Sequence, residues 1–318
     1  MSNLLFSLNG TVPLFLIMLL GYLLRRKGFL TDAFIANANK LLFNVTIPVL
    51  LFHDLSSVDV RVDFDGRYLL FCFLSTLASI AVVWVLARLF IRRRELIGEF
   101  VQGCFRSSAA ILGAAFIQNI YGDSSMSGLM ILGAVPLYNI FSVIILILEA
   151  PQGAQKSSLS DSIRQSLKGI ATNPIILGIL AGLLASLVRL PIPQMIDKGL
   201  SSLASLTTPL ALIVIGAGFK GKEALGHIRL SVVASAVKLL VLPAVFLPLA
   251  VMMGFADQKL VGLIVMLGSI TTPASYIMAK NMGHDGSLTA SICVITTFFS
   301  AFSLTLWLFV FRSLGYIA

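Results

Sequence analysis

The sequence predicts an all-α polytopic membrane protein: ten transmembrane helices forming two inverted five-helix repeats, with broken, crossing helices four and nine. Composition is the first observation behind this prediction, because 58% of the residues are hydrophobic, 12% are charged and the mean hydropathy is +0.97. Soluble domains carry about 25% charged residues, so this chain has about half their share. Ten long apolar segments and an internal repeat are the other two observations.

Apolar segments long enough to cross a hydrocarbon layer of roughly 30 Å occur ten times. The second and seventh are the most polar, but the internal repeat places a helix at both. The ten segments cover residues 4–24, 34–54, 68–91, 98–121, 126–149, 170–189, 195–217, 229–253, 259–281 and 289–312.

The second half of the chain repeats the first faintly at a constant offset of 161 residues. We therefore expect a first repeat at 1–149, a linker at 150–169 and a second repeat at 170–318. Each repeat holds five spans, and an odd number places the two copies upside down relative to one another. Inverted repeats are typical of secondary transporters, whose solute sites lie near the midplane where the copies meet. The matching pairs are Pro13 and Pro174, Gly21 and Gly182, Leu23 and Leu184, Thr46 and Thr207, Pro48 and Pro209, Ser108 and Ser269, and Gly122 and Gly283.

Lys and Arg alternate between the two sets of connections, and cytoplasmic loops collect these residues. The basic set holds fourteen of them, against six in the other set with the C-terminal end. We expect the basic set, including the linker, to be cytoplasmic and both termini to lie outside. The basic set comprises Arg25, Arg26, Lys27, Arg88, Arg92, Arg93, Arg94, Lys156, Arg164, Lys168, Lys220, Lys222, Arg229 and Lys280.

The net charge of +9 comes from these short runs and forms no continuous surface for nucleic acid. Cys72, Cys104 and Cys293 lie inside apolar segments without metal-like spacing, so they are expected to be small packing residues, not disulfide partners. Basic residues follow the first apolar run and do not precede it, which argues against a cleavable signal peptide. The sequence predicts no cofactor and no metal site.

Span nine contains an irregular stretch from Gly268 to Ser275, with Thr271, Thr272 and Pro273 in its middle. Proline removes a donor and clashes with the preceding turn, and irregular backbone is tolerated in a membrane only where it is buried or lines a cavity. The counterpart in span four, 106–115, is rich in small residues without proline, so close helix packing is an equal alternative there. Together the two stretches favour a crossing of two irregular helices.

Arg106 in span four and Lys238 in span eight are cations inside apolar segments. Such residues usually mark a solute pathway or a paired partner, although each side chain can also extend to the cytoplasmic interface. Five acidic residues lie near span ends, and none offers an obvious mid-span proton relay. Because the ionisable residues inside the spans are basic, the sequence favours an anionic solute. These acidic residues are Asp32, Asp54, Asp123, Glu149 and Asp285.

Amides and prolines inside the spans have two open interpretations. Asn139 follows Pro136 in span five, and an amide at that depth either joins helices or faces a cavity. Asn44 and Thr46 in span two have the same two interpretations. Pro48, which has a counterpart in the other repeat, is expected to shape its helix.

Three stretches resemble the auxin efflux carrier family, which includes plant PIN carriers and bacterial malonate and malate carriers. The first runs from Thr46 to Ser56 (TIPVLLFHDLS) and is similar to the second helix of that family. The second, QGCFRS at 102–107 with NIYGD at 119–123, is similar to the fourth helix of the bacterial members. The third, Pro273–Asp285, is similar to the ninth helix. The resemblance to bacterial members implies an integral membrane protein of the bacterial plasma membrane, that is, the inner (cytoplasmic) membrane.

The resemblance implies a scaffold of helices 1, 2, 6 and 7, often dimeric, and a mobile transport domain of helices 3–5 and 8–10 that moves like an elevator. It also implies a solute site where helices four and nine cross. The family usually has a proline soon after the glycine of helix four, where this chain has Gly113-Ala114-Ala115. The implied site residues are Arg106, Ser107, Ser108, Leu112, Gly113, Ala114, Asn139, Phe141, Thr271, Thr272, Pro273 and Ser275, with Ile47 and Leu51 facing them from the scaffold.

The leading hypothesis is a carrier of a small organic anion, such as a mono- or dicarboxylate. The carrier is expected to form a homodimer in the lipid bilayer and to bind no nucleic acid. One alternative is a sodium-coupled symporter of the bile-acid type, although clustered acidic ligands are scarce. Another is a membrane sensor without flux. An intramembrane enzyme is not expected, because no HExxH, GxSxG or paired-aspartate motif occurs and the three histidines are far apart.

Overall fold

The computed structural model describes residues 2–57, 65–121, 125–150, 172–219 and 227–317, and every regular element in these ranges is helical. Within these ranges, six helical segments are long and apolar enough to cross a membrane, judged by length and composition. The prediction of an all-α polytopic membrane protein is therefore confirmed. These six are Asp32–Ser56, Gly66–Phe90, Met126–Leu148, Gln194–Gly218, Ile228–Met252 and Ser287–Ser313.

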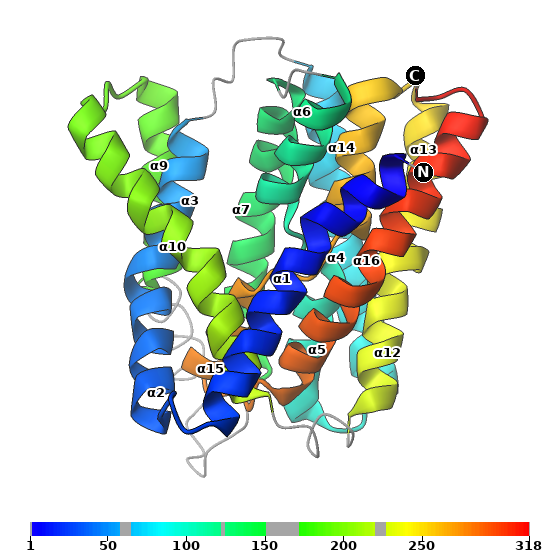
Figure 1. Cartoon of the computed structure of the whole chain (residues 1–318). Helices are drawn as coiled ribbons and strands as arrows, with labels where there is room; N and C mark the ends of the chain where they lie inside the picture. The colour runs from blue at the N-terminus through cyan, green and yellow to red at the C-terminus, as the bar shows by residue number, and fades with distance from the viewer. Residues whose placement is uncertain (1, 58–64, 122–124, 151–171, 220–226, 318) are drawn as a thin grey trace, which may run out of the picture.

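The helices are distributed along the whole chain, and both ends of the chain lie at the same end of the molecule (Figure 1). Two of the ten expected segments, spans four and nine, are each divided into two separate helices. The elements of the first half are α1 (Ser2–Arg26), α2 (Asp32–Leu41), η1 (Leu42–Thr46), α3 (Ile47–Ser56), α4 (Gly66–Phe90), η2 (Arg94–Leu96), α5 (Ile97–Phe105), η3 (Ala109–Gly113), α6 (Ala114–Tyr121) and α7 (Ser125–Leu148). Those of the second half are α9 (Pro174–Val188), α10 (Gln194–Gly218), α12 (Ile228–Ala236), η4 (Val237–Val241), α13 (Leu242–Met252), α14 (Asp257–Gly268), α15 (Ala274–Asn281) and α16 (Ser287–Ser313).

Two long helices accommodate a proline through one wider, π-helical turn. The turn η1 ends two residues before Pro48, and η4 ends two residues before Pro243. A proline inside a helix has no N–H to donate and its ring crowds the preceding turn, so a wider turn just before it relieves the conflict. The helix α10 runs through Pro209 without such a turn. The two prolines at matching positions therefore have different local effects.

Glycines bring two pairs of helices into direct main-chain contact. A Cβ on Gly216 of α10 would lie 1.9 Å from the carbonyl oxygen of Met18 in α1, and one on Gly178 of α9 would lie 2.6 Å from that of Pro48 in α3. Small residues permit this close approach of helices in membranes. Figure 1 shows α9 beside α3 at one edge of the molecule, with α1 crossing α10.

A buried carboxylate joins α5 to the start of α16. Glu99 accepts hydrogen bonds from the amide of Gly286 at 2.9 Å and from the amide and hydroxyl of Thr289 at 2.8 and 2.9 Å. The first amides of a helix have no partner within it, and a negative charge there is favourable. Glu99 thereby caps α16 and holds it against α5, the helix that leads to the first break.

Candidate functional site

The first helix break lies between α5 and η3, where residues 106–108 are not helical. Arg106 has an extended backbone, with φ −70° and ψ 131°. Lys238 of η4 supplies the polar partners that a break inside a membrane requires: its amine donates to the carbonyl of Phe105 at 3.2 Å and to the hydroxyl of Ser107. A cationic donor at the end of a helix is also favourable. The helix is thus interrupted without a proline, with a buried lysine at its end.

The second break lies between α14 and α15, where residues 269–273 are not helical. The hydroxyl of Thr271 donates to the carbonyl of Gly103 at 2.7 Å, and the amide of Thr271 donates to the hydroxyl of Thr296 at 3.1 Å. Pro273 is the N-cap residue immediately before α15, where its missing N–H removes no hydrogen bond of the helix. The expected irregular span nine around this proline is confirmed.

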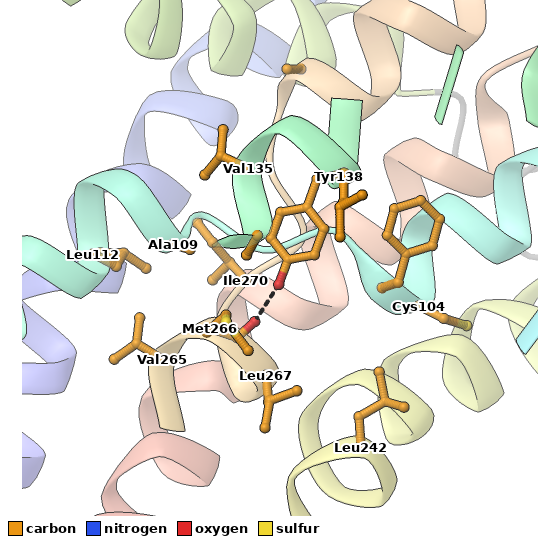
Figure 2. Packing of buried hydrophobic residues seen from close by; sticks show 14 of the residues in the cluster. Cys104, Ala109, Leu112, Val135, Tyr138, Leu242, Val265, Met266, Leu267 and Ile270 are labelled. Atoms are coloured by element: carbon orange, nitrogen blue, oxygen red, sulfur yellow. Dashed lines mark hydrogen bonds between the residues drawn. The ribbon is translucent and has the colours of Figure 1, made fainter. Parts of the chain in front are cut away.

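The two breaks contact each other directly. The amide of Ser108 donates to the carbonyl of Ile270 at 3.1 Å, and the hydroxyl of Ser107 donates to the carbonyl of Met266. Tyr138 of α7 donates to the same Met266 carbonyl at 3.0 Å, as the dashed line in Figure 2 shows. The main-chain groups freed at the breaks are therefore shared between the two halves of the chain.

A cavity of about 60 Å³ lies beside this contact. Its walls come from both breaks and from α3, α7 and α10. Its volume is several times the roughly 10–15 Å³ that one water molecule needs, and far below the ~300–1,000 Å³ of pockets for drug-sized ligands. The lining residues are Ile47, Leu50, Leu51, Asp54, Arg106, Ser107, Ser108, Val135, Tyr138, Asn139, Thr207, Thr208, Ala211, Thr272, Pro273 and Ala274.

Arg106 is the cation of this cavity and is 2% exposed. Its Nη2 donates to Oδ1 of Asn139 at 2.8 Å and its Nη1 to the sulfur of Met278, while its Nε has no partner. Within the described part of the chain it takes part in no ion pair. Its side chain therefore remains inside the protein and does not extend to the interface.

Asn139 has both of the roles that the sequence left open. Its amide nitrogen donates to the carbonyl of Val135 one turn earlier at 2.9 Å, so its oxygen is directed at Arg106. It joins α7 to the first break and also lines the cavity. The asparagine thus fixes the position of the guanidinium without neutralising it.

Eight of the fourteen residues expected at the site line this cavity: Ile47, Leu51, Arg106, Ser107, Ser108, Asn139, Thr272 and Pro273. The others lie elsewhere. Leu112 and Phe141 pack with the hydrophobic core, and Gly113 faces Met130. Thr271 and Ser275 are buried within the second break and α15, where the carbonyl of Ser275 accepts from Gln102 at 3.1 Å. Ala114 begins α6, and its side chain lies outside the described residues.

Sequence reasoning missed four polar residues that line the cavity: Asp54, Tyr138, Thr207 and Thr208. Asp54 lies near the end of its span, as expected, yet it faces the cavity. The repeat already paired Thr207 with Thr46, which was a signal of its position near the meeting point of the two halves. Lys238 was a candidate for the solute route, but it is completely buried against Phe105 and Ser107 instead of lining the cavity.

No group of three His, Cys, Asp or Glu side chains that could hold a metal occurs among the described residues. Cys72, Cys104 and Cys293 are free and buried. The polar groups on the cavity wall are one guanidinium, one carboxylate, hydroxyls, an amide and the start of α15. Such groups bind a solute by charge and hydrogen bonding.

The helices, with a cavity at two helix breaks, identify a polytopic membrane protein. The family model described as "Membrane transport protein" matches residues 6–308. The chain belongs to this family, the auxin efflux carrier family of membrane transport proteins, as the sequence resemblance indicated. Comparison with curated proteins finds no matching relative.

Proposed function

We propose that this chain is a secondary transporter that moves a small organic anion, a carboxylate, across the membrane. The observation that carries the proposal is Arg106, a buried cation on a cavity wall with no ion-pair partner in the described residues. A buried charge is costly unless it is paired, and a bound carboxylate would supply the missing partner. The start of α15, which carries a partial positive charge, lies on the same cavity through Ala274.

The size of the cavity favours a short carboxylate over a bulky one. About 60 Å³ has room for a few non-hydrogen atoms but not for a bile acid. This size favours the anion carrier over the bile-acid-type symporter.

Two repeat-related contacts support the inverted ten-helix arrangement. A Cβ on Gly21 would lie 2.3 Å from the carbonyl oxygen of Ile213, and one on Gly182 would lie 2.9 Å from that of Phe52. Gly182 lies 161 residues after Gly21, and Phe52 lies 161 residues before Ile213. The second contact is therefore the first one with the two halves of the chain exchanged. A two-fold relation between the halves produces such an exchange.

The proposed mechanism is elevator-like. The scaffold would consist of α1, α2–α3, α9 and α10, and the transport domain would consist of α4–α7 and α12–α16. The cavity lies between these groups, since Ile47 and Leu51 come from the scaffold and Arg106 and Thr272 from the two breaks. Movement of the breaks past α3 and α10 would carry the solute across.

We further propose a homodimer formed through the scaffold, in a bacterial inner membrane, with both termini outside. Exposed leucines on α9 and α10, such as Leu184 and Leu206, offer an apolar surface to lipid or a second copy. The common position of the two chain ends in Figure 1 fits an even number of crossings.

The test is binding and uptake of short carboxylates by the purified protein in proteoliposomes. Arg106→Gln is expected to reduce both at least tenfold, because it removes the cation but keeps a donor of similar shape; tenfold corresponds to about 1.4 kcal/mol. Arg229→Gln, which removes an exposed arginine of α12, is the matched control. Full uptake by the Arg106→Gln variant would contradict the proposal, and sodium-dependent uptake would favour the symporter. Binding without flux would indicate a sensor.

A further inference from the structure

Three titratable side chains form a line from the protein surface to the cavity. Asp197, near the start of α10, has a side chain that is 51% exposed, and its Oδ1 lies 3.6 Å from Nε2 of His53. Nδ1 of the same imidazole lies 3.9 Å from Oδ1 of Asp54. Asp54 in turn lines the cavity that contains Arg106. An aqueous proton therefore has a route of ionisable groups to the candidate solute site.

Asp54 and Arg106 are the two charged residues that line the cavity. Near Asp54, α3 contributes His53, α10 contributes Asp197 and α7 contributes the neutral Tyr138 and Asn139. The helix α9, which packs against α3, contains no ionisable residue in its span 174–188. The charge state of Asp54 therefore decides whether the cavity is net neutral or net positive.

We propose that Asp54 is the proton-binding residue of the transport cycle and that one proton enters the cavity with each solute anion. This inference rests on the proposed anion-carrier function and assigns its coupling ion. An ionised Asp54 would repel the carboxylate across a small cavity of low dielectric, whereas a protonated Asp54 leaves Arg106 with the solute as its one anionic partner.

The charge balance favours this pairing. With Asp54 ionised and the cavity empty, the two lining charges cancel. Binding a monoanion and a proton together keeps the sum at zero, so the loaded cavity crosses the bilayer without net charge. Moving one uncompensated charge would couple the step to the membrane potential, at about 2.3 kcal/mol per 100 mV. Asp54 removes that coupling and makes the pH gradient the driving force for a monoanion.

His53 is suited to pass the proton between the two aspartates. Its ring nitrogens lie 3.6 and 3.9 Å from the two carboxylates, slightly beyond a direct hydrogen bond. His53 and Asp197 therefore connect Asp54 to the protein surface, and Asp54 itself sets the stoichiometry.

The experiment measures binding of two anions, pyruvate and oxalate, to the purified protein between about pH 5 and about pH 8, where both probes are ionised. Wild-type affinity for the probe that binds is expected to rise as the pH falls, by up to about tenfold per pH unit. Asp54→Asn is expected to bind with an affinity that does not change with pH. Asp32→Asn, which alters an exposed aspartate paired with Arg25, is the matched control and should keep the wild-type pH dependence.

A second measurement uses the wild-type protein alone, so it does not depend on the folding of a variant. Calorimetric titration in buffers of different ionisation enthalpy counts the protons taken up per anion, and about one is expected above pH 7. Binding without proton uptake, or a pH dependence retained in Asp54→Asn, would overturn this inference and leave the anion carrier intact. Failure of the wild type to bind either probe or any other short carboxylate would instead overturn the proposed function.

Discussion

The hydroxyl of Thr207 donates a 3.1 Å hydrogen bond to the main-chain carbonyl of Thr46, and these two threonines occupy corresponding positions in the two halves of the chain. The relation is not symmetric in detail, because the hydroxyl of Thr46 is buried without a partner. Only Thr207 of the pair lines the cavity. Two residues related by the 161-residue offset thus contact each other but make different hydrogen bonds.

This asymmetry predicts opposite effects for one substitution at the two positions. Thr207→Val should destabilise the protein by about 1 kcal/mol, because it removes a buried hydrogen bond. Thr46→Val should be neutral or stabilising, because it replaces a buried hydroxyl without a partner by a methyl group of similar size. Thermal unfolding in detergent measures both effects. Equal losses at the two positions would show that the bond from Thr207 is not what holds α10 to η1.

Lys238 is predicted to stabilise the first helix break. Lys238→Met should cost about 1–3 kcal/mol, since the carbonyl of Phe105 and the hydroxyl of Ser107 lose a buried donor. The opposing effect is relief of the desolvation cost of a buried amine. Chemical unfolding decides which effect is larger, with exposed Arg229→Met on the same helix as control. A more stable Lys238→Met variant would mean that the amine is retained for function at the expense of stability.

Close packing of α1 on α10 gives a third prediction, with a control on the same helix. Gly216→Ala places a Cβ 1.9 Å from the carbonyl of Met18, so the two helices must separate and the protein should unfold at a lower temperature or fail to accumulate. Gly199, also in α10, has nothing within 4 Å of the corresponding position. Gly199→Ala should therefore be neutral or slightly stabilising, by up to about 1 kcal/mol. Similar melting temperatures for both variants would contradict the close contact.

The sequence predicted the helical class, the ranges of the helices and the second break, because hydropathy and Pro273 are local signals. It also indicated Arg106 and Asn139, whose polar groups are conspicuous in apolar segments. It did not reveal how the first break is held, because the donor, Lys238, is 133 positions away from Phe105. The sequence also indicated only that Asp54 lies near the end of a span. Its place on the cavity wall depends on where α3 passes the two breaks, which is again a contact between distant segments.

Leu112, Phe141 and Ser275 show the limit of transferring site residues by position. Ser275 directly follows the lining residue Ala274, and Phe141 lies two residues after Asn139, but helical geometry directs neighbouring side chains to different faces. Leu112 and Phe141 accordingly pack with the core, and Ser275 points into the buried side of α15. Side-chain direction at an irregular break depends on tertiary contacts, and a linear motif does not encode it.

The ion pair between Asp65 and Lys259 predicts a pH-dependent contribution to stability at one end of the molecule. Lys259 donates to Oδ2 of Asp65 at 2.6 Å, while Oδ1 caps α4 by accepting from the amides of Arg67 and Tyr68 at 2.9 and 3.1 Å. The hydrogen bond from Lys259 holds the pKa of the Asp65 carboxyl below its ordinary value. A group whose pKa is lower in the folded state stabilises that state above its unfolded pKa, about 3.9 for aspartate. The contribution is lost as the pH falls through the folded pKa.

Asp65→Asn should therefore lower the unfolding temperature at about pH 7, and its difference from wild type should shrink as the pH falls below the unfolded pKa of aspartate, about 3.9. The loss at neutral pH should be modest, about 0.5–1 kcal/mol, because both side chains are partly exposed and asparagine remains a good helix cap. Lys259→Gln should give a similar loss with the same pH dependence, since it removes the other partner. A difference between wild type and Asp65→Asn that is unchanged at low pH would show that the cap, and not the charge of Asp65, provides the stability.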